Sequence, residues 1–316
     1  MNEIVTDLHQ PVMLQEVIEN LNVNPDGIYI DATFGRGGHA RAILDLLSDK
    51  GKLLVFDKDP TAIKVAHMMQ EHDQRIIPFH SSYKNLALHC QSKGLMGRVD
   101  GILFDLGVSS PQLDRAERGF SFMKDGPLDM RMNLEQKETA ESWINSAQQQ
   151  EIATVLKNYG DERFAKKIAT SIVKEREHKR FTTTKQLSDF ICSVMPSKDK
   201  FKHPATRSFQ AIRIHINQEI KELTLVLEQI NSILKVGGRL CVISFHSIED
   251  RVVKKFISEY AKGDFFPRGF PVTMLQMKPQ LRAIGKGYKP TESEIEHNVR
   301  SRSAVLRVAE KIAEGL

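Results

Sequence analysis

The sequence, 316 residues long, predicts an α/β protein whose sheet-forming chain is interrupted by a helical insertion. Two observations support this fold class. Strand-like apolar runs alternate with helical patterns over about the first hundred residues, which is typical of a parallel sheet with helices on both faces. The alternation then gives way to a long segment with helical patterning alone. We therefore expect one α/β domain formed by residues 1–112 and 213–316 around a mainly helical domain at 113–212.

The elements of the first stretch follow one another at short intervals. Strands are predicted where apolar residues run together, and helices where apolar residues recur every three or four positions. Pro60 suits the first turn of a helix, where a missing backbone N–H costs nothing. The predicted strands are 27–30, 52–56, 75–79 and 99–104, and the predicted helices are 40–47, 60–70 and 83–93.

The rest of the chain first loses and then regains sheet signals. Residues 107–132 are rich in Gly, Ser, Pro and Asp and predict a long loop, and residues 139–195 predict helices. The alternation of helix and strand signals then returns. It predicts an amphipathic helix at 219–234, a turn at 236–238, a strand at 238–245, a helix at 250–260 and a last strand at 304–308. We expect these later strands to complete the sheet that the first stretch begins.

Composition excludes several classes of protein. Hydrophobic residues make up 41% and charged residues 27% of the chain, as in ordinary globular proteins. No apolar run approaches the ~20 residues that span a bilayer, and the N-terminus lacks a signal segment, so we expect a cytoplasmic protein without a membrane partner. Cys90, Cys192 and Cys241 lie far apart and indicate neither a disulfide framework nor a metal site.

The distribution of positive charge is more informative than the net charge of +5. Residues 157–185 contain nine Lys or Arg against four Asp or Glu. Such an excess is typical of a surface that binds a phosphate backbone, although a solvated helix face has the same composition. Phe201 and Phe209 lie among further basic residues. Their rings could stack on splayed bases, or they could anchor a hinge between domains.

The most specific local pattern is Asp-Ala-Thr-Phe-Gly-Arg-Gly-Gly-His at 31–39, between a predicted strand and a predicted helix. Glycine lets the chain turn sharply and lets a ligand approach the backbone. Asp57 ends the next strand 20 residues after Gly37, the spacing at which an acidic residue meets ribose hydroxyls. Asp31, Asp57 and Asp105 each end a predicted strand, where parallel sheets bind their ligands.

The glycine spacing distinguishes between cofactors. Gly35, Gly37 and Gly38 form G-x-G-G, whereas a dinucleotide site has G-x-G-x-x-G. Asp31 would repel a pyrophosphate but suits the cationic methionine end of S-adenosylmethionine. The sequence therefore favours S-adenosylmethionine over a dinucleotide, with an ordinary strand-to-helix turn as the remaining alternative.

Motifs that match one known family extend over almost the whole chain. They lie at 9–12 with Glu16, 31–39, 57–60, 105–112, 118–122, 126–131, 159–163, 201–213, 243–247 with 249–251, and 300–303. On these residues the chain resembles the bacterial RsmH/MraW family of small-subunit ribosomal RNA (cytosine-N4)-methyltransferases. The resemblance implies a Rossmann-like class I methyltransferase domain with an RNA-recognition insertion, and S-adenosylmethionine as the cofactor. The implied substrate is the exocyclic N4 amine of a cytosine in the decoding region of small-subunit (16S) ribosomal RNA.

The resemblance also assigns site residues through matching motif positions. It implies cofactor contacts at Gly37, Gly38, His39, Asp57, Tyr83, Asp105 and Gln112. Tyr83 stands where the family often has Phe, and because the ring is kept we expect packing against adenine to survive. We expect substrate contacts at Ser109, Ser110, Lys202, His203, Arg207, Arg213 and His246.

The chemistry calls for an acceptor of the amine hydrogens, because the lone pair of the cytosine amine is conjugated into the ring. Many amine-directed enzymes use Asp/Asn/Ser-Pro-Pro-Tyr/Phe, whereas this chain has Asp-Leu-Gly-Val-Ser-Ser-Pro-Gln at 105–112. Asp105 is our candidate catalytic residue, with the backbone beyond it, Ser109 and Ser110 as alternatives.

Rival functions are a Rossmann oxidoreductase, a non-catalytic RNA-binding factor, and methylation of protein or small molecules. The sequence leaves the oligomeric state, including a homodimer, open.

Overall fold

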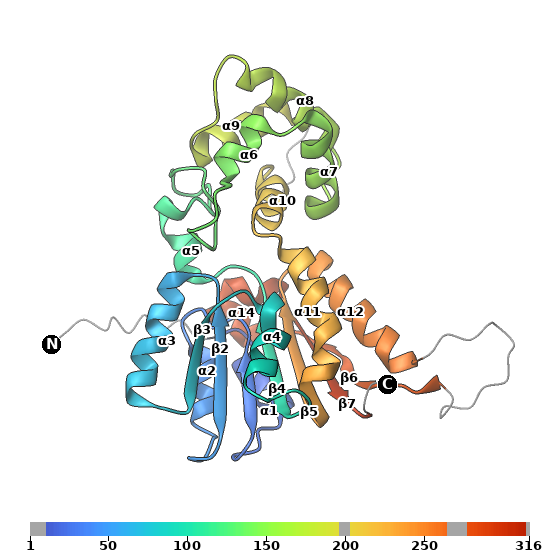
Figure 1. Ribbon diagram of the computed structural model, residues 1–316. Coiled ribbons are helices and arrows are strands. Elements are labelled where there is room, and N and C mark those ends of the chain that lie inside the picture. The colour runs from blue at the N-terminus through green and yellow to red at the C-terminus, as the bar shows by residue number, and fades with distance from the viewer. Residues whose placement is uncertain (1–10, 196–202, 264–276, 314–316) are drawn as a thin grey trace, which may run out of the picture. The chain divides into compact units, whose positions relative to one another are not determined.

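The computed structural model describes residues 11–195, 203–263 and 277–313 (Figure 1). Its contacts divide the chain into two compact units, residues 1–107 with 220–316 and residues 108–219. The boundaries drawn from the sequence lie five to seven residues away from these. Ile212 and Ile216 are buried in the core of the second unit, which keeps the chain with that unit up to Glu219.

The first unit, which we call the sheet unit, contains a seven-stranded sheet in the order β3-β2-β1-β4-β5-β7-β6. Strands β1 to β5 are parallel, and β7 runs antiparallel to both β5 and β6. The carboxyl ends of the five parallel strands therefore lie along one edge. The strands are β1 (Ile28–Asp31), β2 (Lys52–Asp57), β3 (Ile76–His80), β4 (Val99–Asp105), β5 (Leu234–Ser244), β6 (Leu281–Tyr288) and β7 (Val305–Lys311).

Helices cover both faces of this sheet (Figure 1). Within β2, Leu53 and Val55 pack on one face while Leu54 and Phe56 pack on the other, as the alternation of side chains along a strand requires. The first face is covered by α1 (Leu14–Leu21), α2 (Gly38–Leu44) and α3 (Pro60–His72). The second face is covered by α4 (Leu86–Ser92), α11 (Glu219–Ile233) and α12 (Ser247–Lys262). The short elements η1 (Tyr83–Asn85), α14 (Glu292–His297) and η3 (Val299–Ser303) complete the unit.

The predicted strands are all present, and the structure adds features that the sequence did not indicate. The predicted turn at 236–238 is an irregularity within β5, where the pairing with β4 shifts register and Gly237 has a φ of 82°. β6 was not predicted. It is an edge strand, largely exposed, and contains Gly285 and Gly287, so it lacks the apolar run that marks a buried strand.

The second unit, which we call the helical unit, has a core built from helices (Figure 1). Thr139 and Thr183 begin two of them as N-caps, because each side chain accepts a hydrogen bond from a backbone N–H three residues on. The described elements are α5 (Ser110–Asp114), η2 (Ala116–Arg118), α6 (Ala140–Ser146), α7 (Gln149–Gly160), α8 (Ala165–Arg176), α9 (Thr184–Val194) and α10 (Thr206–Ile216).

The segment predicted as a loop at 107–132 contains α5 and η2 and is held by polar side chains. Asn217 is buried, donates to the carbonyl oxygen of Met130 and accepts from the backbone N–H of Met132. Arg118 is also buried and donates to the carbonyl oxygen of Arg131. These bonds satisfy backbone groups that no helix or strand satisfies. Among the described helices none has both the length and the apolar character needed to cross a membrane.

Candidate functional site

The glycine turn between β1 and α2 depends on its glycines for two different reasons. Gly37 has a φ of 73°, and a Cβ there would lie 2.6 Å from Cζ of Phe34. A Cβ on Gly38 would lie 2.3 Å from Cγ of Pro11. Gly37 therefore provides the left-handed turn. Gly38 permits close packing against the chain before α1, a reason that the sequence did not reveal.

Asp57, at the end of β2, ties this turn to the sheet. Its Oδ2 accepts from the backbone N–H of Gly35 at 2.9 Å, and its Oδ1 accepts from the N–H of Asp59 at 2.8 Å. Burial raises the pKa of Asp57, and these two amide hydrogen bonds act against that rise. A carboxylate oxygen has further lone pairs, so the predicted contact with ribose hydroxyls is compatible with both bonds.

Three carboxyl groups lie at the ends of the adjacent strands β2, β1 and β4, as the sequence predicted. Burial raises the pKa of Asp31 to about 7, and the charge of Asp57 adds to this rise. Burial also raises the pKa of Asp105 to about 8, with contributions from Asp31 and Glu249. Ionised carboxylates here are desolvated and repel one another, so a bound cation would stabilise them. We call Asp31, Asp57 and Asp105 the acidic cluster.

His39 lies beside this cluster in the first turn of α2. Its Nε2 is 3.1 Å from the carbonyl oxygen of Val12, and its Nδ1 is 3.7 Å from Oδ2 of Asp105. Burial lowers the pKa of His39 to about 4, so the imidazole is neutral at neutral pH.

The ring of Tyr83 contacts an aromatic side chain and lies near a lysine. Its ring lies edge-on to Phe104 with centroids 5.6 Å apart, and Nζ of Lys58 is 5.8 Å from its centroid. The buried carboxylate of Glu222 binds Nζ of Lys58 at 2.5 Å and Nζ of Lys84 at 3.1 Å. The sequence missed Glu222 because a pairing between residues so far apart leaves no local pattern. Packing of Tyr83 against adenine stays a prediction.

Gln112, Ser109 and Ser110 belong to the helical unit, at the start of α5. Oε1 of the buried Gln112 accepts from the backbone N–H of Ser109 at 3.0 Å, which places both residues in a capping box. This observation gives Gln112 a structural role. Its predicted contact with the cofactor, and the predicted contacts of the two serines with substrate, stay predictions.

Several side chains in α10 and just before it contact other residues of the helical unit. His203 stacks on Phe122 with centroids 4.5 Å apart, and the buried Phe209 packs edge-on to the same ring. Phe209 therefore lies in the core of the helical unit, and both roles drawn from the sequence, stacking on a base and anchoring a hinge, stay predictions. Arg213 forms a bidentate pair with the buried Glu219 at 2.8 and 2.9 Å. Phe201 and Lys202 lie outside the described residues.

The predicted substrate contacts of His203, Arg207 and Arg213 stay predictions. The structure adds that Arg207 is half-buried and that the charge of Arg213 is already balanced within its own unit. A phosphate contact by Arg213 would have to share the guanidinium with Glu219.

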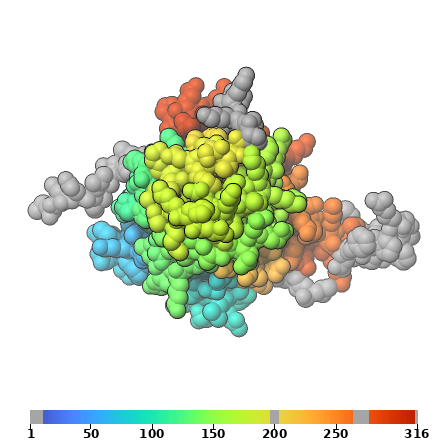
Figure 2. Space-filling model, turned by 90° about the horizontal axis from the view of Figure 1, so that it is seen from above, coloured from blue at the N-terminus to red at the C-terminus, as the bar shows by residue number. Residues whose placement is uncertain are grey.

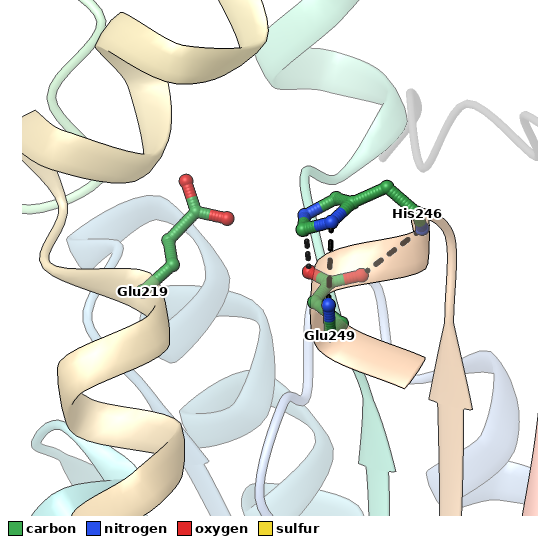
Figure 3. Close-up of side chains that lie close together, drawn as sticks. All are labelled: Glu219, His246 and Glu249. Carbon is green, nitrogen blue, oxygen red and sulfur yellow. Dashed lines mark hydrogen bonds and ion pairs between the residues drawn. The ribbon is translucent and has the colours of Figure 1, made fainter. Parts of the chain in front are cut away.

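His246 begins α12 in the sheet unit, and Figure 3 shows its imidazole directly over the start of that helix. Its Nε2 is 3.1 Å from Oε1 of Glu249, and Oε2 of Glu249 accepts from the backbone N–H of His246. The two residues form a capping box, which gives His246 a structural role at the start of α12. Its predicted contact with substrate stays a prediction.

The helical unit carries exposed basic residues, several of them on α8. This helix belongs to the yellow-green segment that faces the viewer in Figure 2. Seven exposed residues have no ion-pair partner within 11–195 and 203–263, the described part of this region. They are Lys157, Arg163, Lys166, Lys167, Lys174, Lys179 and Arg180. Unpaired and exposed positive charge is what a phosphate backbone attracts.

Together, the strand order, the reversed β7, the glycine turn after β1 and the acidic strand ends define a Rossmann-like class I methyltransferase fold. The chain belongs to the MraW methylase family, whose model matches residues 6–312. S-adenosylmethionine is therefore its cofactor, as the sequence predicted.

The curated relatives are similar over nearly their whole length. "Ribosomal RNA small subunit methyltransferase H" of Alteromonas mediterranea is 52% identical over 306 residues, which cover 96% of this chain and 97% of the relative. The protein of the same name from Coxiella burnetii is 52% identical over 307 residues, which cover 97% and 100%.

The similar solved structures share much less sequence identity with this chain. A putative rRNA-methylase from Clostridium thermocellum is 11% identical with a TM-score of 0.45, over 96% of this chain and 98% of that one. A putative methyltransferase from Streptococcus mutans in complex with SAH is 13% identical with a TM-score of 0.42, over 95% and 97%.

Proposed function

We propose that this protein transfers the methyl group of S-adenosylmethionine to the exocyclic N4 amine of a cytosine in the decoding region of small-subunit (16S) ribosomal RNA. The acidic cluster beside the glycine turn is the observation that carries the proposal, because desolvated carboxylates favour a cationic methyl donor. The names of the curated relatives support ribosomal RNA of the small subunit as the substrate.

The residues of the sheet unit fit the parts of the cofactor. S-adenosylmethionine supplies a methyl group on a positively charged sulfur. Asp31 is buried and acidic, which suits the cationic methionine end, and Asp57 can accept from the ribose hydroxyls. The ring of Tyr83, held by Phe104, suits the adenine. Contacts from Gly37, Gly38, His39 and Gln112 complete the proposed set.

Asp105 is our candidate for the acceptor of the amine proton. Its Oδ1 is buried and has no hydrogen-bond partner within the part of the chain that the structure describes. A buried acceptor without a donor is costly, and a substrate amine would satisfy it. Burial raises the pKa of Asp105 to about 8, close to the value that suits a group exchanging a proton near neutral pH. Ser109 and Ser110 stay alternatives.

The helical unit is the proposed RNA-recognition part. Its exposed basic residues supply phosphate contacts independent of sequence, which position a nucleic acid without selecting a base. We place the protein in the cytoplasm, where its substrate is assembled, with no membrane partner.

Methyl transfer to two substrates tests this function. The target amine must leave any stacked arrangement before it can reach a buried methyl group, and a small site offers too little contact to select one base. We therefore expect purified small ribosomal subunits to accept labelled methyl groups efficiently and a short oligonucleotide with the same cytosine to react poorly. Equal rates on both would show that local sequence suffices and that the helical unit does not recognise a folded ribosomal surface.

A further inference from the structure

Glu222 of α11 is a buried carboxylate that binds two lysines of the sheet unit. Its Oε2 is 2.5 Å from Nζ of Lys58, and its Oε1 is 3.1 Å from Nζ of Lys84. Oε2 also accepts a hydrogen bond from the hydroxyl group of Ser82 at 2.8 Å. Glu222 is only 5% exposed, and a charge so deeply buried is costly unless it is paired and hydrogen-bonded. The three contacts provide that pairing, and they fix the position of the ammonium group of Lys58.

Lys58 lies beside the residues that we expect to bind the adenosine part of the cofactor. It directly follows Asp57, the predicted acceptor for the ribose hydroxyls. Its Nζ is 5.8 Å from the ring centroid of Tyr83, the predicted partner of adenine. The pairing with Glu222 therefore determines where a positive charge stands within the predicted cofactor site.

Asp57 is the alternative partner for Lys58 that lies next to it in the chain. Burial raises the pKa of Asp57, and the charge of Lys58 is among the influences that lower it, so the two groups are within electrostatic reach. The side chain of Lys58 is 15% exposed, whereas that of Lys84 is 42% exposed. Without the charge of Glu222, Lys84 could turn to water, but the mostly buried Lys58 would need another anion.

We propose that Glu222 is a positioning residue for S-adenosylmethionine, because it keeps the ammonium group of Lys58 away from Asp57 and so leaves that carboxylate available to the ribose hydroxyls. Oδ1 and Oδ2 of Asp57 each already accept from one backbone N–H. An ammonium group bound there would take up the remaining lone pairs that the hydroxyls need. This inference rests on the proposed function through the ribose contact of Asp57, and it does not depend on which base is methylated.

Isothermal titration calorimetry with S-adenosylhomocysteine tests this role without any methyl transfer. We expect Glu222→Gln to bind this ligand about tenfold more weakly, because a hydrogen bond to a charged group is lost. Glu228→Gln is the matched control, because Glu228 is an exposed residue of the same helix. Thermal denaturation of each variant shows that it is folded at the temperature of the titration. Unchanged affinity in Glu222→Gln would overturn the proposal.

Removal of both members of the ion pair separates this role from a general loss of structure. Lys58→Met keeps most of the length of the side chain without its charge. In the double variant Glu222→Gln/Lys58→Met we expect the affinity to return close to that of the unaltered protein, because no ammonium group remains to bind Asp57. A merely structural role of Glu222 predicts no such recovery, and its absence would contradict the proposal.

The single variant Lys58→Met completes the comparison. We expect it to bind S-adenosylhomocysteine nearly as well as the unaltered protein does. A loss as large as that in Glu222→Gln would mean that Lys58 itself contacts the cofactor, and the proposal would fail.

An analogue of S-adenosylhomocysteine that lacks the ribose 2′-hydroxyl distinguishes failure of this proposal from failure of the proposed cofactor contacts. The unaltered protein should bind the analogue about tenfold more weakly than S-adenosylhomocysteine, and Glu222→Gln should bind the two ligands almost equally. If the unaltered protein does not discriminate, the ribose contact of Asp57 is wrong and the inference falls with it. If both proteins discriminate equally, the ribose contact stands and the role given to Glu222 is wrong.

Discussion

Replacement of Asp57 by Asn tests two roles of this carboxylate separately. One is the observed pair of hydrogen bonds that hold the glycine turn, and the other is the predicted contact with the ribose of the cofactor. Its two oxygens accept from the N–H groups of Gly35 and Asp59 at 2.9 and 2.8 Å. Asn keeps one acceptor and places an NH₂ group against the other N–H, so one of these bonds is lost and the predicted ribose acceptor is weakened. Hydrogen bonds to charged groups contribute about 1.5–3 kcal/mol, so affinity for S-adenosylmethionine should fall by between about tenfold and about a hundredfold.

Folding should change far less than binding in this variant. Burial raises the pKa of Asp57, so the ionised carboxylate is desolvated, and a neutral Asn removes that cost while losing one amide bond. We expect the free energy of unfolding to change by at most about 1 kcal/mol, since a neutral hydrogen bond contributes about that much. Isothermal titration calorimetry and thermal denaturation measure the two effects. Asp59→Asn is the control, because Asn also caps α3 well. Unchanged affinity in Asp57→Asn would remove this residue from the cofactor site.

Three further predictions follow from the electrostatics and packing. Affinity for S-adenosylmethionine should rise from pH 6 to pH 9, because Asp31 and Asp105, with pKa values raised to about 7 and about 8, ionise in this range and attract the cation. S-adenosylhomocysteine, which lacks the sulfonium charge, should show a smaller rise in the same calorimetric series, and equal slopes would contradict this explanation. Asn217→Leu should destabilise the helical unit by about 2–4 kcal/mol, because buried backbone groups lose their partners. Fluorescence of Trp143, the one tryptophan of the chain, reports this unfolding, and an unchanged transition would refute the role of Asn217. Neutralising three exposed lysines of α8 should weaken RNA binding and flatten its salt dependence, while cofactor affinity stays unaltered. The lysines are Lys166, Lys167 and Lys174. An unchanged dependence of RNA affinity on salt would show that this helix does not face the phosphate backbone.

The buried part of the sheet was predictable because its signals are local. β2 and β4 are continuous apolar runs, and each ends at an acidic residue, Asp57 or Asp105. The alternation with helices predicted parallel strands, and parallel strands bring such residues to one edge. The edge strand β6 escaped prediction because its burial is slight and its glycines break the apolar pattern.

The chemistry of the site was only partly predictable, because it depends on contacts between distant segments. The glycine turn predicted a cofactor site, but the bond from Gly35 to Asp57 and the contact of Gly38 with Pro11 required the fold. The pairing of Lys58 with Glu222 joins residues with no shared motif. A single sequence carries no signal for such pairs, whereas a motif of adjacent residues is visible at once.

Mapping of modified nucleosides in small-subunit ribosomal RNA, by mass spectrometry from cells with and without this protein, tests the central claim most directly. We predict that loss of the protein removes one methyl group from N4 of a cytosine in the decoding region, and that the Asp57→Asn variant restores it poorly. An unchanged methylation pattern, or a lost methyl group on another base or on a ring carbon, would contradict the account.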